Sequence, residues 1–322
     1  MDGIFVINKG DGLTSHDVVA RVRRLAHQKR VGHAGTLDPA ATGVLPILLG
    51  QATRVAEYLS ESGKAYRAVI RFGVETNTYD REGDVTRTAP TDDLTLERIS
   101  AALPDFLGEQ DQLPPIYSAI KRDGRPLYAL ARAGEAVTVE PRRVRIDALR
   151  VVAWEPPDLT LDVECGKGTY IRSLAHDLGQ RLGPGAHLAA LTRTRSGPFT
   201  LDQAITLERL EQALASDDWR AHFFAADEAL LDWRALILGE TSEMRMRQGQ
   251  PLRFGAPPRI VASSLTGAGE DRSPRAMGDG PGVGSPARVY STDGRFLGIA
   301  LWSDEQDAWQ PHKVLPTTLE VD

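Results

Sequence analysis

Alternating apolar and polar side chains predict several β-strands in the first 200 residues. Residues 64–73 place apolar side chains at every second position, the period of a strand with one buried face, and these are Tyr66, Ala68, Ile70 and Phe72. The uninterrupted apolar run at 44–50 predicts a buried strand. Further strands are predicted at 3–9, 142–154 and 159–165, and the last two are expected to pair.

Helical spacing of apolar residues separates these strands. After Thr14, the side chains of Val18, Val22 and Leu25 recur at intervals of four and three, and Asp17 stands where a capping box has its acidic residue. Further helices are predicted at 51–60, 94–103, 170–183 and 201–235. Strands and helices mixed in this way indicate an α+β protein.

The last part of the chain has the pattern of a separate, smaller unit. Gly, Ser and Pro crowd residues 262–286, which predicts a flexible loop. Short apolar strands at 287–290 and 296–300 flank a Ser-Thr-Asp-Gly-Arg turn, which is typical of a hairpin. The chain is therefore expected to have two domains, at 1–234 and 235–322.

Composition then limits the class of protein. The 322 residues are 41% hydrophobic and 25% charged, and no apolar run reaches the ~18 residues that a membrane span needs. The N-terminus lacks the basic and apolar regions of a signal peptide. A single cysteine, Cys165, excludes an internal disulfide framework, so a cytoplasmic protein is expected.

The net charge of −6 argues against a protein that binds any polyanion, yet the charge is unevenly distributed. Residues 1–200 carry 26 Lys and Arg against 25 Asp and Glu, whereas residues 201–322 carry 12 against 19. Basic residues cluster at 21–33 and 119–145. A solvated face is the simpler interpretation of such clusters, and a local nucleic-acid surface is the alternative.

Glycine and proline crowd residues 32–46, which read Gly-His-Ala-Gly-Thr-Leu-Asp-Pro-Ala-Ala-Thr-Gly-Val-Leu-Pro. They favour an ordered loop with special backbone angles over a helix. Because this loop leads into the buried strand at 44–50, its carboxylate, Asp38, is able to approach a ligand. Asp-Pro is also ordinary turn chemistry, and from spacing alone a turn-capping Asp38 is the simpler interpretation.

The run from His33 to Pro46 resembles, without a gap, the catalytic motif of the TruB family of tRNA pseudouridine synthases. The resemblance implies that Asp38 is the catalytic aspartate and that His33 is an active-site histidine that binds the RNA. Further segments resemble other blocks of the family, and they are Lys-Ala-Tyr-Arg at 64–67, residues 166–175 and residues 185–199.

These further blocks imply roles for four more side chains. By the resemblance, Tyr66 stacks on the target uracil and Leu191 lines the uracil pocket. Arg172 pairs with the catalytic aspartate, and Tyr170 joins the same polar network, with a role in proton transfer. The resemblance leaves open whether the catalytic aspartate attacks C1′, adds to C6 or removes a ribose proton.

The resemblance also implies an architecture. It predicts a pseudouridine synthase fold, with a mixed, mainly antiparallel sheet flanked by helices in a catalytic domain at 1–234. It implies that residues 113–141 are an insertion that closes over RNA. A small β-rich, PUA-like RNA-binding domain is expected at 235–322.

The implied activity is isomerisation of uridine-55 in the T-loop of tRNA to pseudouridine, with a further ability to assist tRNA folding. The expected partner is the T-arm stem-loop of tRNA, without a membrane, an obligatory protein partner, a metal or an organic cofactor. One alternative is an RNA-binding, tRNA-folding protein whose catalysis is dispensable. Another is a guide-RNA-dependent pseudouridylase subunit, which the acidic residues at 319–322 disfavour because those relatives commonly carry basic tails.

Overall fold

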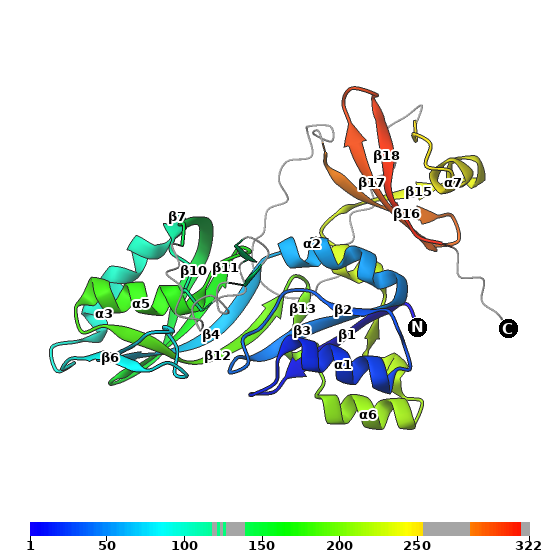
Figure 1. The fold of residues 1–322 in the computed structure, drawn as a ribbon. Coiled ribbons are helices and arrows are strands. Elements are labelled where there is room, and N and C mark those ends of the chain that lie inside the picture. The colour runs from blue at the N-terminus through cyan, green and yellow to red at the C-terminus, as the bar shows by residue number, and fades with distance from the viewer. Residues whose placement is uncertain (118–120, 123–124, 127–138, 254–283, 317–322) are drawn as a thin grey trace. The chain divides into compact units, whose positions relative to one another are not determined.

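The chain forms two compact units, Met1–Phe224 and Ala225–Asp322 (Figure 1). Most of the expected insertion at 113–141 and of the expected loop at 262–286 lies outside the described residues. The computed structural model describes residues 1–117, 121–122, 125–126, 139–253 and 284–316.

Most strands of the first unit join one mainly antiparallel sheet. These strands are β1 (Gly3–Lys9), β2 (Val31–His33), β3 (Thr42–Leu49), β4 (Lys64–Phe72), β7 (Gly108–Gln112), β10 (Arg142–Glu155), β11 (Asp158–Cys165), β12 (Ala186–Ser196), β13 (Phe199–Thr200) and β14 (Phe223–Phe224). Within the described residues their order is β14-β1-β3-β12-β4-β11-β10-β7, with β2 beside β3 and β13 beside β12. β12 and β3 run parallel, and the other described pairings of this sheet are antiparallel.

Two small hairpins accompany the sheet. They are β5 (Val74–Thr76) with β6 (Val85–Thr88), and β8 (Lys121–Arg122) with β9 (Arg125–Pro126). The α+β class, the mainly antiparallel sheet and the pairing of the strands predicted at 142–154 and 159–165 are confirmed.

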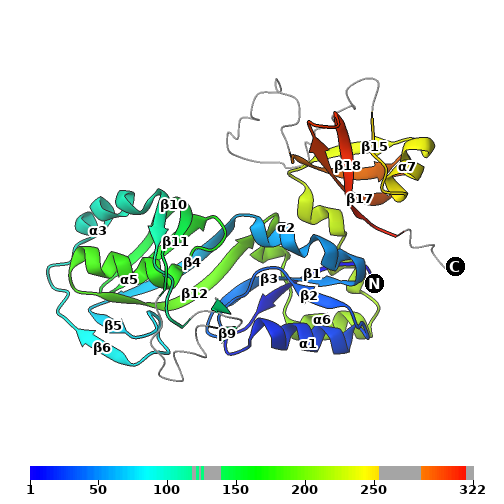
Figure 2. The ribbon, with the colours of Figure 1, turned by 45° about the horizontal axis from the view of Figure 1, so that its top comes forward.

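Helices cover two separate parts of the sheet, and each part has its own hydrophobic core (Figures 1 and 2). The helices are α1 (Ser15–Leu25), α2 (Ala56–Glu61), α3 (Leu96–Ala102, continued by a 3₁₀ turn at Leu103–Phe106), α5 (Ile171–Leu182) and α6 (Leu207–Ala215). α1 and α6 lie side by side over β1 and β3, where Val18 and Leu45 pack. α3 and α5 lie over β4 and β11, where Leu161 and Leu174 pack.

The two cores meet where β3 and β12 run side by side. These strands pair over residues 42–43 and 192–193, a junction that is called the seam below. Tyr66 on β4 and Leu191 on β12 pack against both cores. Tyr66 and Leu191, which were predicted to enclose the uracil, therefore lie close together at the seam.

Two of the predicted helices differ from the observed structure. The segment at 51–60 begins as a 3₁₀ helix, Gly50–Val55, and is α-helical only from Ala56, in α2. The segment at 201–235 contains α6, but the rest forms β14 and short 3₁₀ turns at Leu201–Gln203, Trp219–His222 and Ala226–Leu230. Phe223 packs on Phe5 with ring centroids 4.7 Å apart, so pairing with β1 overrides the helical pattern there.

The second unit has a separate sheet in the order β15-β16-β17-β18, with α7 beside it (Figure 1). Its elements are β15 (Arg234–Leu238), α7 (Glu240–Arg247), β16 (Pro286–Ser291), β17 (Phe296–Ser303) and β18 (Ala308–Val314). β16 and β17 form the predicted hairpin, and β15 runs parallel to β16. Leu236 and Trp309 belong to its buried core.

Candidate active site

The loop that holds Asp38 runs between β2 and β3 and is tied to β1 by a buried lysine. Lys9 is fully buried, and its Nζ donates to the carbonyl oxygens of Gly10, Leu13 and Pro39 at 2.7–2.9 Å. Hydrogen bonds from a charged donor are stronger than those between neutral groups. The residue that follows Asp38 is therefore fixed to the end of β1.

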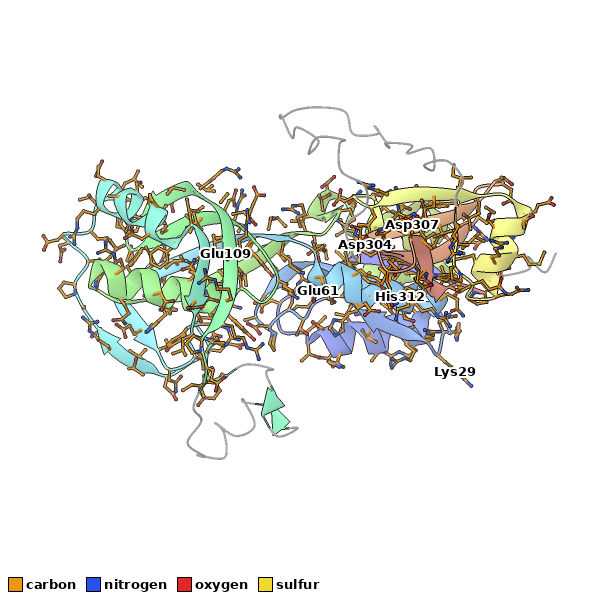
Figure 3. All side chains as sticks on the ribbon, turned by 90° about the horizontal axis from the view of Figure 1, so that it is seen from above. Lys29, Glu61, Glu109, Asp304, Asp307 and His312 are labelled. Carbon is orange, nitrogen blue, oxygen red and sulfur yellow. The ribbon has the colours of Figure 1, made fainter. Side chains whose placement is uncertain are left out.

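Replacing Lys9 with Met is expected to lower the free energy of unfolding by about 2–3 kcal/mol, because three carbonyl groups lose a charged donor. Urea unfolding followed by circular dichroism measures this change. Lys29→Met is the matched control, since Lys29 is exposed and points away from the ribbon (Figure 3). Equal stability of the two variants would contradict this role of Lys9.

Arg172 in the first turn of α5 faces Asp38. Its side chain is 7% exposed, and its Nε lies 3.0 Å from Asp38 Oδ2. Its Nη1 donates to the Tyr117 carbonyl at 3.1 Å and to Asp80 Oδ2 at 3.2 Å. A cation in the first turn of a helix opposes the helix dipole, and the two carboxylates compensate for this. The Asp38 side chain thus points at a guanidinium group.

Asp80 belongs to this cluster although the sequence analysis did not select it. It lies in the connection between β5 and β6, with a side chain that is 15% exposed. Thr78 Oγ1 donates to its Oδ1 at 2.6 Å, and the Leu188 amide of β12 donates to the Tyr79 carbonyl at 2.9 Å. One property of Arg172 could have indicated such a residue. A buried arginine that faces one carboxylate has further N–H donors, and these need a second acceptor such as Asp80.

The environment of Asp38 favours its protonated form more than water does. Burial raises the pKa of the Asp38 carboxyl, the Arg172 charge opposes this, and the Asp80 charge adds to it. The side chain keeps 44% of its surface exposed, and that surface opens into two cavities. A carboxylate with raised proton affinity that remains accessible is suited to act as a base or as a nucleophile.

The larger cavity measures about 230 Å³ and lies against the seam. Five of the residues that the sequence analysis selected line it, and they are Asp38, Tyr66, Tyr170, Arg172 and Leu191. Tyr66 and Leu191 supply apolar walls, while Asp38 and Arg172 supply charge at one end. A cavity that combines apolar walls with convergent polar and charged groups is typical of a ligand site.

Tyr170 reaches the cavity from the residue before α5. Its φ of −96° and ψ of 110° make it the N-cap, so the predicted helix start at Tyr170 is wrong by one residue. Buried Gln112 accepts from the Tyr170 amide at 2.8 Å and donates to its carbonyl at 3.1 Å. This pair of hydrogen bonds holds the backbone extended, and a distant strand provides it, so local sequence could not reveal it.

His33 is absent from the described residues that line the larger cavity. It pairs with Ile47 across β2 and β3, and its ring meets the His16 ring edge-on, with centroids 5.5 Å apart. Burial lowers the pKa of His33, and the neighbouring His16 adds to this. The structure therefore places His33 beside α1.

The part of the chain that the structure describes offers neither a metal site nor a membrane-spanning helix. Among its residues, no three His, Cys, Asp or Glu side chains are grouped so that they could hold a metal ion. In the same part of the chain, no helix combines the length and the apolar character needed to cross a membrane.

Comparison with protein families gives two matches that adjoin each other. Residues 23–171 match the family model described as TruB family pseudouridylate synthase (N terminal domain). Residues 172–234 match the one described as tRNA pseudouridylate synthase B C-terminal domain. The second match reaches only the first residue of β15, so the sheet of the second unit lies beyond it.

Whole-chain relatives agree with these matches. The tRNA pseudouridine synthase B of Pseudomonas aeruginosa is 46% identical over 310 residues, which are 95% of this chain and 93% of the relative. The enzyme of the same name from Pseudomonas syringae is 44% identical over 304 residues, or 93% and 91% of the two chains.

Among solved structures, an H/ACA RNP bound to a substrate RNA containing 2'-deoxyuridine has a similar fold. The TM-score is 0.72 at 24% identity, and the match covers 98% of this chain and 85% of the other. A Cbf5-Nop10-Gar1 complex gives a TM-score of 0.70 at 25% identity, with coverages of 97% and 84%. The likeness supports the mixed α+β fold followed by a small β-sheet domain.

Proposed function

This chain belongs to the TruB family of pseudouridylate synthases and is a tRNA pseudouridine synthase, an isomerase, and we propose that its target is uridine-55 in the T-loop of tRNA. The observation that carries the proposal is the Asp38–Arg172 pair beside a cavity walled by Tyr66 and Leu191. A charged pair beside a cavity with both apolar and polar walls suits a single base that has left its stack, because a base has apolar faces and polar edges.

The reaction breaks the bond between ribose C1′ and uracil N1, turns the base and joins C1′ to C5. N1 gains a proton and C5 loses one, so no net oxidation or reduction occurs. We propose Asp38 as the essential carboxylate, in one of three steps: attack at C1′, addition at C6 or removal of a ribose proton. Each step needs an ionised carboxylate, and the Arg172 charge favours that form.

The remaining site residues receive complementary roles in this proposal. Tyr66 stacks on the uracil and Leu191 forms the opposite wall of the cavity. Tyr170 lines the same cavity and assists proton transfer at C5. His33 lies beside α1 and is not among the described residues that line the larger cavity, which fits a contact with the RNA stack that the base has left.

Recognition of the T-arm is proposed to rest on its shape. A folded loop presents phosphates and hydroxyl groups in a fixed arrangement, so an acidic protein needs only local basic contacts. The segment at 113–141 is proposed to close over the stem-loop, and the PUA-like domain at 235–322 to contact RNA as well. No cofactor and no obligatory protein partner are part of the proposal.

The test uses an unmodified tRNA transcript and a matched transcript with cytidine at position 55. Pseudouridine is mapped by carbodiimide labelling and reverse transcription. We expect one modified site, position 55, in the first transcript and none in the second. Pseudouridine at another position would contradict the proposed target. If the purified protein alone forms no pseudouridine, a guide-dependent or a tRNA-folding role would be favoured.

A further inference from the structure

A second buried arginine lies on the seam, and no role for it follows from the motifs. Arg193 on β12 is 1% exposed, and within the described residues its guanidinium group forms no ion pair. Burying a charged group without a countercharge is costly unless hydrogen bonds satisfy its donors. The hydrogen-bond partners of this guanidinium group therefore indicate its structural role.

Two of these partners belong to the loop that holds Asp38, and the third belongs to β3, which follows it. Arg193 Nε donates to the Val44 carbonyl at 2.7 Å, Nη2 to the Gly35 carbonyl at 3.1 Å and Nη1 to the Thr36 carbonyl at 3.4 Å. Gly35 and Thr36 precede Asp38, and Val44 follows it. The guanidinium group thus joins both ends of the loop, which the planar fork of arginine allows and a lysine ammonium does not.

Two glycines beside Asp38 make room for Arg193: Gly35 of the loop for its guanidinium group, and Gly43 of β3 for its backbone. A Cβ atom on Gly43 would lie 2.2 Å from the Arg193 carbonyl oxygen, and one on Gly35 would lie 3.3 Å from Arg193 Nη1. Both glycines also have positive φ, +100° and +83°. The glycine pattern around Asp38 is therefore matched to the position of Arg193.

Arg193 also lies beside the side chain that was assigned to base stacking. It stands opposite Tyr66 in the pairing of β12 with β4, and both residues line the larger cavity. Burial raises the pKa of Tyr66 and the Arg193 charge opposes this, so the hydroxyl stays protonated at neutral pH. The residue that holds the Asp38 loop is thus the cross-strand neighbour of Tyr66.

We propose that Arg193 is a positioning residue that fixes the Asp38 carboxylate relative to the Tyr66 ring. It acts through the carbonyl groups on either side of Asp38 and through its place opposite Tyr66 on β12. The inference rests on the proposed roles of Asp38 and Tyr66. A reacting group that moves by about 1 Å loses on the order of 10²-fold in rate, so such a contact affects turnover more than binding.

The test compares Arg193→Lys, Arg193→Met and Tyr66→Phe, with Arg195→Lys as the matched control. Arg195 lies on the same strand, is 30% exposed in its side chain and pairs with Glu164. Single-turnover release of tritium from C5-labelled uridine in bulk tRNA gives the rate at any position, and filter binding gives the tRNA affinity. Thermal melting shows whether each variant folds.

We expect Arg193→Lys to lower the single-turnover rate by roughly 10- to 100-fold, with tRNA affinity within about threefold of wild type. Arg195→Lys should keep the wild-type rate. Combining Arg193→Lys with Tyr66→Phe should cost less than the product of the two single losses, because neighbouring side chains that line one cavity are energetically coupled. Guanidinium ion added to Arg193→Ala should restore part of the rate, and a merely structural arginine would show no such rescue.

Wild-type rates in both Arg193→Lys and Arg193→Met would overturn the proposal. So would losses of rate that are matched by equal losses of tRNA affinity. If Arg193→Met does not fold, Arg193→Lys and the guanidinium rescue decide alone. If the wild-type enzyme modifies a uridine other than uridine-55, this test still applies, because tritium release does not depend on position. Full activity of Asp38→Asn, in contrast, would contradict the role of Asp38 on which the proposal rests.

Discussion

Asp38→Asn is expected to stop pseudouridine formation while tRNA binding stays within a few-fold of wild type. Asparagine keeps the size of the side chain and accepts a hydrogen bond from Arg172, but it carries no charge and is neither a base nor a nucleophile. Loss of a group at the centre of a reaction typically costs 10⁴-fold or more, so we expect a fall of at least about 10⁴-fold. Single-turnover tritium release and filter binding, made on the same preparation, separate the two effects.

The same variant should be more stable than wild type at neutral pH. Burial raises the pKa of Asp38 in the folded protein, so ionisation costs more there than in the unfolded chain. The cost is absent below the unfolded pKa of about 4 and grows as the pH rises towards the folded pKa. The gain in melting temperature of Asp38→Asn should therefore appear at neutral pH and vanish below about pH 4.

Residual activity above one part in a hundred would contradict an essential role of this carboxylate. Loss of tRNA binding by Asp38→Asn would indicate that the side chain contributes mainly to affinity. Asp162→Asn provides a control, because Asp162 also pairs with an arginine, Arg67, but does so on the exposed part of the sheet.

Arg172→Met is expected to slow the reaction by about 10²- to 10³-fold, the usual cost of removing one group that stabilises charge in an active site. Without the guanidinium group, Asp38 and Asp80 lose their shared cation. The Arg172 charge lowers the pKa of Asp38, so its removal raises that pKa further. A smaller fraction of Asp38 is then ionised at neutral pH.

The sign of this effect predicts a change in the pH profile. The acidic limb of the single-turnover rate should move to higher pH in Arg172→Met, and part of the lost rate should return as the pH is raised. Arg181→Met is the control, since Arg181 lies on the same helix and pairs with Asp105 at the surface. An unshifted limb in Arg172→Met would mean that the guanidinium group does not act through the carboxyl of Asp38.

The sequence predicted those parts of the site whose information is local. The alternation in β4 placed Tyr66 on the face of Ala68 and Ile70, and the structure has this face against the core. The Gly- and Pro-rich run around Asp38 predicted a rigid loop before a buried strand. The alternation of apolar residues and the backbone preferences of glycine and proline depend on only a few neighbouring residues. They can therefore be recognised in the sequence without knowledge of the fold.

Residues that distant pairing brings to the site could not be read in this way. Asp80 lies in a polar connection, and only its contact with β12 through Tyr79 and Leu188 brings it to Arg172. Arg193 and Arg195 look alike along the chain, yet one is buried and the other is partly exposed. A register shift in β12 lies between them, and no local pattern indicates it.

The seam has a consequence for the order in which the enzyme is made. Thr42 and Thr192, whose hydroxyl groups meet there at 2.9 Å, are separated by 150 positions along the chain. At about 5–20 residues per second, a ribosome adds the second of them roughly 8–30 s after the first. For most of that interval the nascent Asp38 loop has neither of its guanidinium partners, because Arg172 is added only shortly before Thr192 and Arg193 directly after it. The active site is thus completed late in synthesis, when β12 pairs with β3. Contacts between residues so far apart in sequence also form slowly during folding.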